Sequence, residues 1–73
     1  IKFDIIFADP PYNFKESKAI PEIVFSKKLL NKGGLLIIEH GRELNFDKSI
    51  NFIDKRNYSS VNFSFFMENQ ENE

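Results

Sequence analysis

The sequence predicts an α/β fold in which a strand, a helix and a second strand are followed by an antiparallel hairpin. A mostly apolar run at residues 3–8 and an apolar run at 35–39 are typical of parallel strands that are buried on both faces. A helical segment lies between them, and alternating polar and apolar residues follow at 61–67. Because strands joined by a helix usually lie parallel in one sheet, we expect a mixed sheet with a helix on one face.

The first expected strand, at residues 3–8, is short and rich in β-branched and aromatic side chains. It ends at Asp9-Pro10-Pro11, because two consecutive prolines donate no hydrogen bond to a sheet and force an extended backbone. A polar loop is expected to follow at residues 13–18.

A helix is expected to begin at Ile20-Pro21-Glu22, since proline suits the first turn and glutamate favours the positive end of the helix dipole. We place its end loosely near Leu30, and Gly33-Gly34 then supplies the turn into the second strand. Phe25 and Leu29 fall off the apolar stripe. The residues expected to face the sheet are Ile20, Ile23, Val24 and Leu30.

The second half of the chain is expected to form a strand at residues 35–39, a polar loop at 40–48 and a hairpin. The hairpin strands, at 50–58 and 61–67, meet at Ser59-Ser60. The period-two pattern of the last strand is typical of an antiparallel strand at the margin of a sheet. We expect its buried face to hold Val61, Phe63 and Phe65, and Phe66 to point the other way.

Composition excludes several classes of protein. The 73 residues contain no Cys and one His, so neither a disulfide framework nor a cysteine–histidine metal site is predicted. The 10 basic and 11 acidic residues give a net charge of −1, which argues against binding nucleic acid through the whole surface. No apolar run approaches the roughly 18 residues of a membrane-spanning helix, and no signal peptide opens the chain, so we expect a cytoplasmic location.

The two ends of the chain differ in character. Ile1 opens directly inside an apolar run, whereas residues 68–73 are polar and acidic. We therefore expect part of a domain at residues 1–67, a disordered acidic tail at 68–73, and a longer parent protein. One helix covers only one face of a sheet, so either a missing N-terminal half completes the domain or copies of the chain associate.

The tetrapeptide Asp9-Pro10-Pro11-Tyr12 carries the strongest chemical signal, because ligands of open α/β sheets bind beyond the carboxyl ends of the strands. The exocyclic amino group of a base is a weak nucleophile, since its lone pair is delocalised into the ring. The Asp9 carboxylate and the Pro10 carbonyl can accept its two hydrogens and so aim the lone pair at a methyl donor. Tyr12 can stack on a base that has left its helix or loop.

This tetrapeptide after an apolar strand resembles the catalytic motif of amino-methyltransferases that use S-adenosylmethionine. Together with residues 29–35, 37–40 and 55–58, it makes the chain resemble the C-terminal half of the bacterial RsmD family, which methylates guanine N2 of 16S rRNA. The resemblance covers nearly the whole chain up to Met67. It implies the later strands of a Rossmann-like (class I) methyltransferase sheet, and ribosomal RNA or the small ribosomal subunit as partner.

The chain departs from the family pattern in a respect that matters for the methyl donor. Gly33-Gly34 and Gly41 are isolated glycines, and no Gly-rich loop follows a strand. The donor site would therefore be at most partial, through Asp9. We predict that these 73 residues alone catalyse no methyl transfer.

The candidate site residues follow from the motif and from its surroundings. We assign catalysis to Asp9, Pro10, Pro11 and Tyr12, binding of S-adenosylmethionine to Asp9, and substrate binding to Tyr12, Asn13 and Arg42. The alternative interpretation of the tetrapeptide is a plain strand terminator.

The other candidates have ordinary structural alternatives. Arg42, Lys55 and Arg56 either meet phosphates or belong to a solvated surface, since acidic residues are interleaved among them. His40 is interpreted as a structural histidine that bonds the backbone or Glu39, with a general base or an RNA contact as the alternative. Two further functions stay open for the whole protein: a DNA adenine-N6 or cytosine-N4 methyltransferase, and a non-catalytic α/β module that binds a partner through its strand edges.

Overall fold

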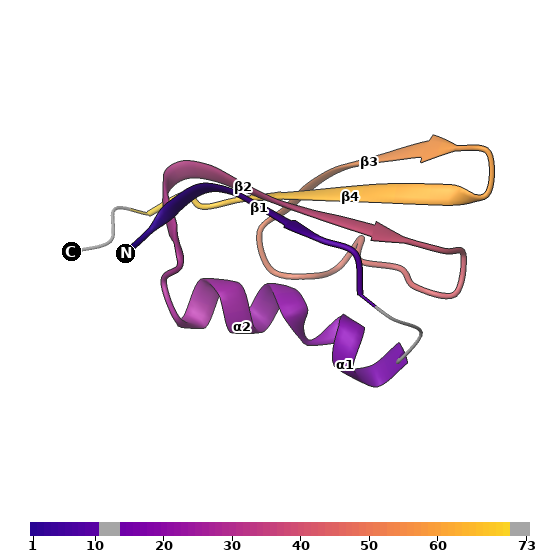
Figure 1. Ribbon diagram of the computed structural model, residues 1–73, viewed down its shortest axis with the longest axis horizontal. Helices are drawn as coiled ribbons and strands as arrows, with labels where there is room; N and C mark the ends of the chain where they lie inside the picture. The colour runs from indigo at the N-terminus through magenta and orange to yellow at the C-terminus, as the bar shows by residue number, and fades with distance from the viewer. Residues whose placement is uncertain (11–13, 71–73) are drawn as a thin grey trace.

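The computed structural model describes residues 1–10 and 14–70 of the chain (Figure 1). Within them, two short helices lie between the first two of four strands, where the sequence predicts one helix. Their bounds are β1 Phe3–Ala8, α1 Phe14–Lys18, α2 Ile20–Ser26, β2 Leu30–His40, β3 Phe52–Tyr58 and β4 Val61–Met67.

The four strands form one sheet in the order β1-β2-β4-β3. β1 pairs parallel to β2, whereas β4 pairs antiparallel to both β2 and β3. β3 therefore runs parallel to β2, and the carboxyl ends of β1, β2 and β3 lie at the same edge of the sheet. The predicted class is confirmed, a strand-helix-strand unit followed by an antiparallel hairpin. The prediction that the last strand lies at the sheet margin is wrong, because β4 lies between β2 and β3.

The helical segment differs from its predicted extent at both ends. Residues 14–18 form α1 where a loop was expected, and α2 ends at Ser26 rather than near Leu30. The end is set by Lys28, whose φ of 54° cannot continue a helix, and by hydrogen bonds from the amides of Lys27 and Leu29 back to α2 carbonyls. Leu30 is instead the first residue of β2.

The face of α2 that meets the sheet is only partly the one expected, since Val24 is buried and Ile20 packs against the core as predicted. Phe25, predicted to lie off the apolar stripe, is buried, while Ile23 is 47% exposed. Pro21, Val24 and Phe25 are spaced three and four residues apart, so they share one side of the helix, and this is the buried side.

Gly33-Gly34 lies inside β2 rather than in the turn before it. Phe3 aligns with Leu30 and Ile5 aligns with Leu35, so β2 contributes extra residues at this point and the pairing is irregular. Gly33 has a φ of 79°, and a Cβ on Gly34 would lie 2.8 Å from the Asn31 carbonyl oxygen. The glycines therefore permit an irregularity within the strand, because a larger residue at either position would be strained or would clash.

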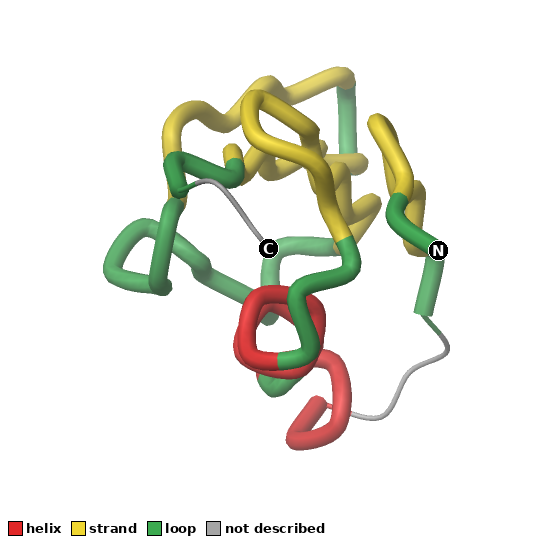
Figure 2. The backbone as a smooth tube through the Cα atoms, turned by 90° about the vertical axis from the view of Figure 1, so that its left-hand side faces the viewer, coloured by secondary structure: helices red, strands yellow, loops and turns green. Residues whose placement is uncertain are grey.

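One face of the sheet is covered by α2 and by the loop at residues 41–51 (Figure 2). Phe46 in this loop is fully buried, and its ring meets the ring of Phe66 edge-on with centroids 5.5 Å apart. Phe66 in turn meets Phe52 at 5.8 Å, which ties β3 to the same core. The buried hydrophobic cluster consists of Val24, Phe25, Leu30, Leu36, Ile38, Phe46 and Phe66.

The buried face of β4 is the opposite of the one expected. Asn62, Ser64 and Phe66 are the buried positions, while Phe63 and Phe65 are only half-buried. The prediction that Phe63 and Phe65 form the core face is therefore wrong. The physical reason is that the 41–51 loop covers this face of β4, while His40 of β2 and the Gly41 carbonyl give Ser64 and Asn62 their polar partners.

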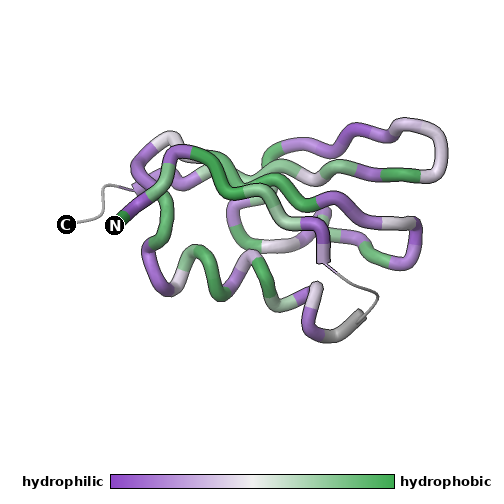
Figure 3. The backbone as a smooth tube through the Cα atoms, viewed as in Figure 1, coloured by the Kyte–Doolittle hydropathy of each residue, from purple (hydrophilic) through white to green (hydrophobic). Residues whose placement is uncertain are grey.

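The other face of the sheet has no covering layer among the described residues (Figures 1 and 2). It is strongly apolar, because β1, β2 and β4 each carry hydrophobic residues through this part of the sheet (Figure 3). Ile5 is 61% exposed and Phe7 is 55% exposed. The register places Ile5, Phe7, Leu35, Ile37, Phe65 and Met67 on this open face.

Candidate active site

The first two residues of the predicted motif lie at the carboxyl edge of the sheet. Ala8 ends β1 in register with Ile38, and Asp9 and Pro10 follow it at the carboxyl edge that β1 shares with the parallel strand β2. Asp9 is exposed and Pro10 is half-buried. An exposed carboxylate at the carboxyl end of a parallel strand is where an open α/β sheet binds its ligands.

The remaining residues of the motif are Pro11, Tyr12 and Asn13, and they lie outside the described residues. The catalytic role assigned to Pro11 and Tyr12, and the substrate contact assigned to Tyr12 and Asn13, therefore stay predictions.

Arg42 follows β2 at the same edge as Asp9, in the turn that opens the 41–51 loop, and is exposed. β1 and β2 are neighbours and run in the same direction, so the fold brings Asp9, Pro10 and Arg42 to one edge from distant parts of the sequence. This guanidinium is available to a phosphate that approaches the carboxyl edge.

Lys55 and Arg56 in β3 face acidic neighbours within the chain. Lys55 Nζ lies 3.8 Å from an Asp47 carboxylate oxygen, and Arg56 Nε donates to Asp54 Oδ2 at 3.3 Å. The hydrogen bond to Asp54 raises the pKa of Arg56 above its ordinary value. Both ion pairs are exposed and reduce the positive charge that β3 offers to a phosphate.

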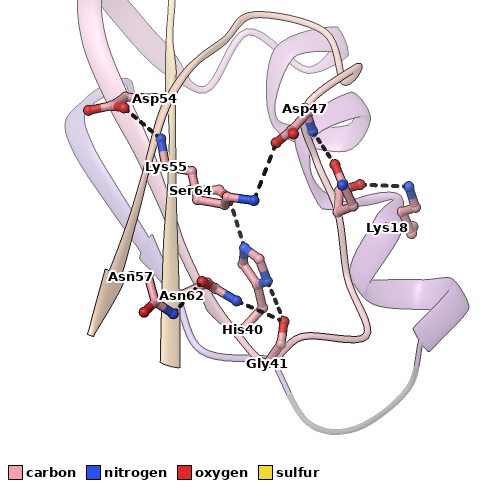
Figure 4. A network of polar contacts seen from close by, with 10 residues as sticks. Lys18, His40, Gly41, Asp47, Asp54, Lys55, Asn57, Asn62 and Ser64 are labelled. Carbon is pink, nitrogen blue, oxygen red and sulfur yellow. Dashed lines mark hydrogen bonds and ion pairs between the residues drawn. The ribbon is translucent and has the colours of Figure 1, made fainter. Parts of the chain in front are cut away.

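His40, the last residue of β2, is the centre of a buried polar network (Figure 4). Its Nδ1 lies 2.9 Å from the Gly41 carbonyl oxygen, and its Nε2 lies 2.7 Å from Ser64 Oγ. Asn62 Nδ2 donates to the same Gly41 oxygen at 3.4 Å, and Asn57 Nδ2 donates to Asn62 Oδ1 at 2.9 Å. In the described part of the chain, every buried side-chain nitrogen or oxygen has at least one hydrogen-bond partner.

The sequence did not predict this network. His40 bonds a backbone carbonyl, in line with its structural interpretation, but its side-chain partner is Ser64 and not Glu39. Glu39 aligns with Phe63 on the open face of the sheet. The available signal was the regular placement of Asn62 and Ser64 within an otherwise apolar strand, which requires a polar partner wherever that face is buried.

The residues at the carboxyl edge supply only part of a site for S-adenosylmethionine. Asp9 offers one carboxylate there, but Gly33-Gly34 lies toward the opposite end of β2, where the Gly33 amide donates to the Glu68 carbonyl at 2.8 Å. Those glycines therefore take part in the sheet and lie too far along β2 to contact a ligand beside Asp9. A complete donor site does not follow from the described residues.

Residues 1–67 match the family described as conserved hypothetical protein 95. The chain belongs to this family. It is the RsmD-like family to which the sequence resemblance pointed, and that resemblance is confirmed. No curated protein matches the chain.

Two solved structures share the fold of this RsmD-like chain. The first is a Haemophilus influenzae protein provisionally assigned as a methylase, with a TM-score of 0.69 and 17% identity, and the match covers 93% of this chain and 44% of that one. The second is a conserved hypothetical protein of Streptococcus pyogenes, with a TM-score of 0.74, 19% identity, and coverage of 99% and 47%. The chain thus spans less than half the length of these two proteins. None of the helices described for residues 1–10 and 14–70 is long and apolar enough to cross a membrane.

Proposed function

We propose that this chain is the substrate-side part of an S-adenosylmethionine-dependent methyltransferase that acts on guanine N2 of 16S rRNA. The observation that carries the proposal is the position of Asp9 and Pro10, which follow a parallel strand at the carboxyl edge of the sheet with the Asp9 carboxylate exposed. Membership of the RsmD-like family supports the same activity.

The chemistry requires a weak nucleophile to be aimed rather than strongly deprotonated. The lone pair of a base amino group is delocalised into the ring, and it becomes available when the nitrogen turns tetrahedral. The Asp9 carboxylate and the Pro10 carbonyl oxygen accept the two amino hydrogens and favour that geometry. Pro10 follows the end of β1, so its carbonyl is not required by the sheet ladder. Tyr12 stacks on the base in this proposal.

The methyl group comes from the donor, and Asp9 is the residue of this chain that we propose beside it. The rest of the donor site belongs to a glycine-rich loop that these 73 residues do not contain. We therefore propose that the chain by itself does not catalyse methyl transfer.

The proposed partners follow from the charged edge and the open face. Arg42 meets a phosphate of ribosomal RNA, either free or within the small ribosomal subunit, next to the target base. The apolar open face, with Ile5 and Phe7, packs against the rest of the same domain, or against a second copy when the chain is isolated. Cytoplasmic RNA is the substrate in this proposal.

The test is an Asp9→Ala substitution in the natural gene product, assayed with labelled donor and 16S rRNA. Removing the acceptor for the amino hydrogens should lower kcat about 10²- to 10³-fold, while donor binding measured by calorimetry changes little. Asp4→Ala is the matched control, because Asp4 is an exposed carboxylate at the amino end of the same strand. Full activity of Asp9→Ala would rule out the proposed role.

The substrate is tested with the same unaltered protein. Methyl transfer to duplex DNA in preference to rRNA would replace the proposal with a DNA adenine-N6 or cytosine-N4 methyltransferase. Absence of transfer to either nucleic acid would leave a non-catalytic α/β module that binds through its strand edges.

A further inference from the structure

The carbonyl oxygen of Gly41 accepts two hydrogen bonds at the point where β2 ends. One comes from His40 Nδ1 at 2.9 Å and the other from Asn62 Nδ2 at 3.4 Å (Figure 4). We propose that His40 is a positioning residue for substrate binding, which holds the Gly41 carbonyl and thereby places Arg42 at the edge that carries Asp9. This inference rests on the proposed function, because it concerns how that site binds RNA.

The hydrogen-bond partners determine which nitrogen of His40 carries the hydrogen. A carbonyl oxygen only accepts, so Nδ1 must be the protonated nitrogen that faces Gly41. In the neutral ring, Nε2 then accepts the hydroxyl hydrogen of Ser64 at 2.7 Å. Ser64 is fully buried, so no water competes for this bond and the tautomer that clamps Gly41 is favoured.

Packing holds the imidazole ring in this orientation. His40 is 6% exposed, and its ring meets the ring of Phe46 edge-on with centroids 5.0 Å apart. Phe46 is itself fully buried between His40 and Phe66. A ring with two hydrogen bonds and an aromatic neighbour is a rigid anchor for the backbone that it bonds.

The segment that carries Arg42 is held at both of its ends. Gly41 is bonded by His40 and Asn62, and Phe46 is buried in the core four residues beyond Arg42. The Asn45 carbonyl also accepts a hydrogen bond from Lys18 Nζ at 2.8 Å, which ties the segment to α1. Arg42 is exposed between these anchors, so the path of the backbone decides where its guanidinium meets a phosphate.

Loss of the His40–Gly41 hydrogen bond should lower the affinity for RNA rather than slow the chemical step. Asp9 and Pro10 follow β1, and their positions do not depend on the hydrogen bond between His40 and the Gly41 carbonyl. Loss of the hydrogen bond from His40 to Gly41 lets the segment that carries Arg42 move and weakens the contact between Arg42 and a phosphate. This contact is equally strong in the ground state and in the transition state. Such a change raises KM for RNA and leaves kcat nearly unchanged.

Two substitutions test the hydrogen bonds of the two His40 nitrogens one at a time. The side-chain amide of asparagine reaches the position of Nδ1, so His40→Asn keeps the donor to Gly41 and loses the Ser64 bond. The longer glutamine reaches the position of Nε2, so His40→Gln keeps the Ser64 bond and loses the donor to Gly41. Each variant loses one of two hydrogen bonds, and the two melting temperatures should fall by similar amounts.

The experiment measures rRNA methylation by the natural gene product, below the melting temperature of every variant. We expect His40→Gln to raise KM for RNA about tenfold, and His40→Asn to change KM less than about twofold. In the Arg42→Ala background, His40→Gln should raise KM no further, because a residue that acts through Arg42 has nothing left to position. If His40→Gln fails to fold, Asn62→Ala removes the second donor to Gly41 and should raise KM in the same Arg42-dependent way.

Three results would overturn the inference while the unaltered protein is active. They are equal KM values for His40→Asn and His40→Gln, additive effects of His40→Gln and Arg42→Ala on KM, and a loss confined to kcat. An unaltered gene product that transfers no methyl group to rRNA would instead refute the proposed function, and the role of His40 in substrate binding would fall with it.

Discussion

The two faces of the sheet are built from the same strands but behave as different environments. On the covered face, α2 and the 41–51 loop bury Leu36, Ile38 and Phe66 completely, together with the polar Ser64. On the open face, Ile5 and Phe7 are more than half exposed although they are strongly apolar. Burial in this chain is therefore decided by which face a covering layer occupies, and not by the polarity of the side chain.

The comparison also explains where polar groups are tolerated. Ser64 and Asn62 lie on the covered face because His40 and the Gly41 carbonyl give them partners there. A hydrophobic face without a covering layer is typical of a surface that packs against another part of a protein or a partner. The covered face holds the chain together, and the open face is the one available for a further contact.

The largest expected effect distinguishes two adjacent phenylalanines of β4. Phe66→Ala should destabilise the chain by about 3–5 kcal/mol, because the fully buried ring contacts both Phe46 and Phe52. Phe65→Ala, on the open face, should cost about 1 kcal/mol. Urea denaturation followed by circular dichroism measures both losses. Equal losses would mean that the open face is also packed.

Substitutions on the open face of β1 should change the unfolding free energy less than Phe66→Ala does. Ile6 packs against the core cluster, whereas its neighbour Phe7 is 55% exposed. Phe7→Ser should reduce self-association, measured by light scattering after size-exclusion chromatography, and change the unfolding free energy by less than about 1 kcal/mol. Ile6→Ser is the matched control, and it should lower the unfolding free energy without reducing self-association. Unchanged association of Phe7→Ser would exclude the open face as a contact surface.

The smallest effect is expected at the rim of the covered face. Lys55 and Asp47 join β3 to the 41–51 loop by an exposed ion pair with a 3.8 Å separation. Lys55→Ala should lower the unfolding free energy by at most about 0.5 kcal/mol, because water and salt screen the pair. Thermal unfolding at low and at high salt measures the difference. A loss of 2 kcal/mol or more would show that the loop depends on this contact rather than on Phe46.

Much of the fold could be predicted from local patterns. The first strand has the predicted bounds, Phe3–Ala8, and the hairpin strands at Phe52–Tyr58 and Val61–Met67 lie close to theirs. The end of α2 was misplaced because the expected apolar stripe continues to Leu30, whereas the backbone turns at Lys28. Gly33-Gly34 was taken for a turn because an irregularity within a strand needs the same conformational freedom.

The candidate site divides in the same way. The position of Asp9-Pro10 after a strand could be predicted from the sequence, since it depends only on neighbouring residues. The link between His40 and Ser64 could not, because these residues are separated by 24 positions and meet only when β4 pairs with β2.

The α/β class and the position of the motif after a strand could be predicted from residues that are close together in the chain, and the family from the ordered set of such segments along residues 1–67. Contacts between distant parts of the chain decide which face of β4 is buried, why a serine lies in the core, and which residues share the carboxyl edge with Asp9. The physical reason is that strand order and the covering layers depend on contacts between distant residues. An alternating strand shows that two faces differ, but it does not say which of them the rest of the protein will cover.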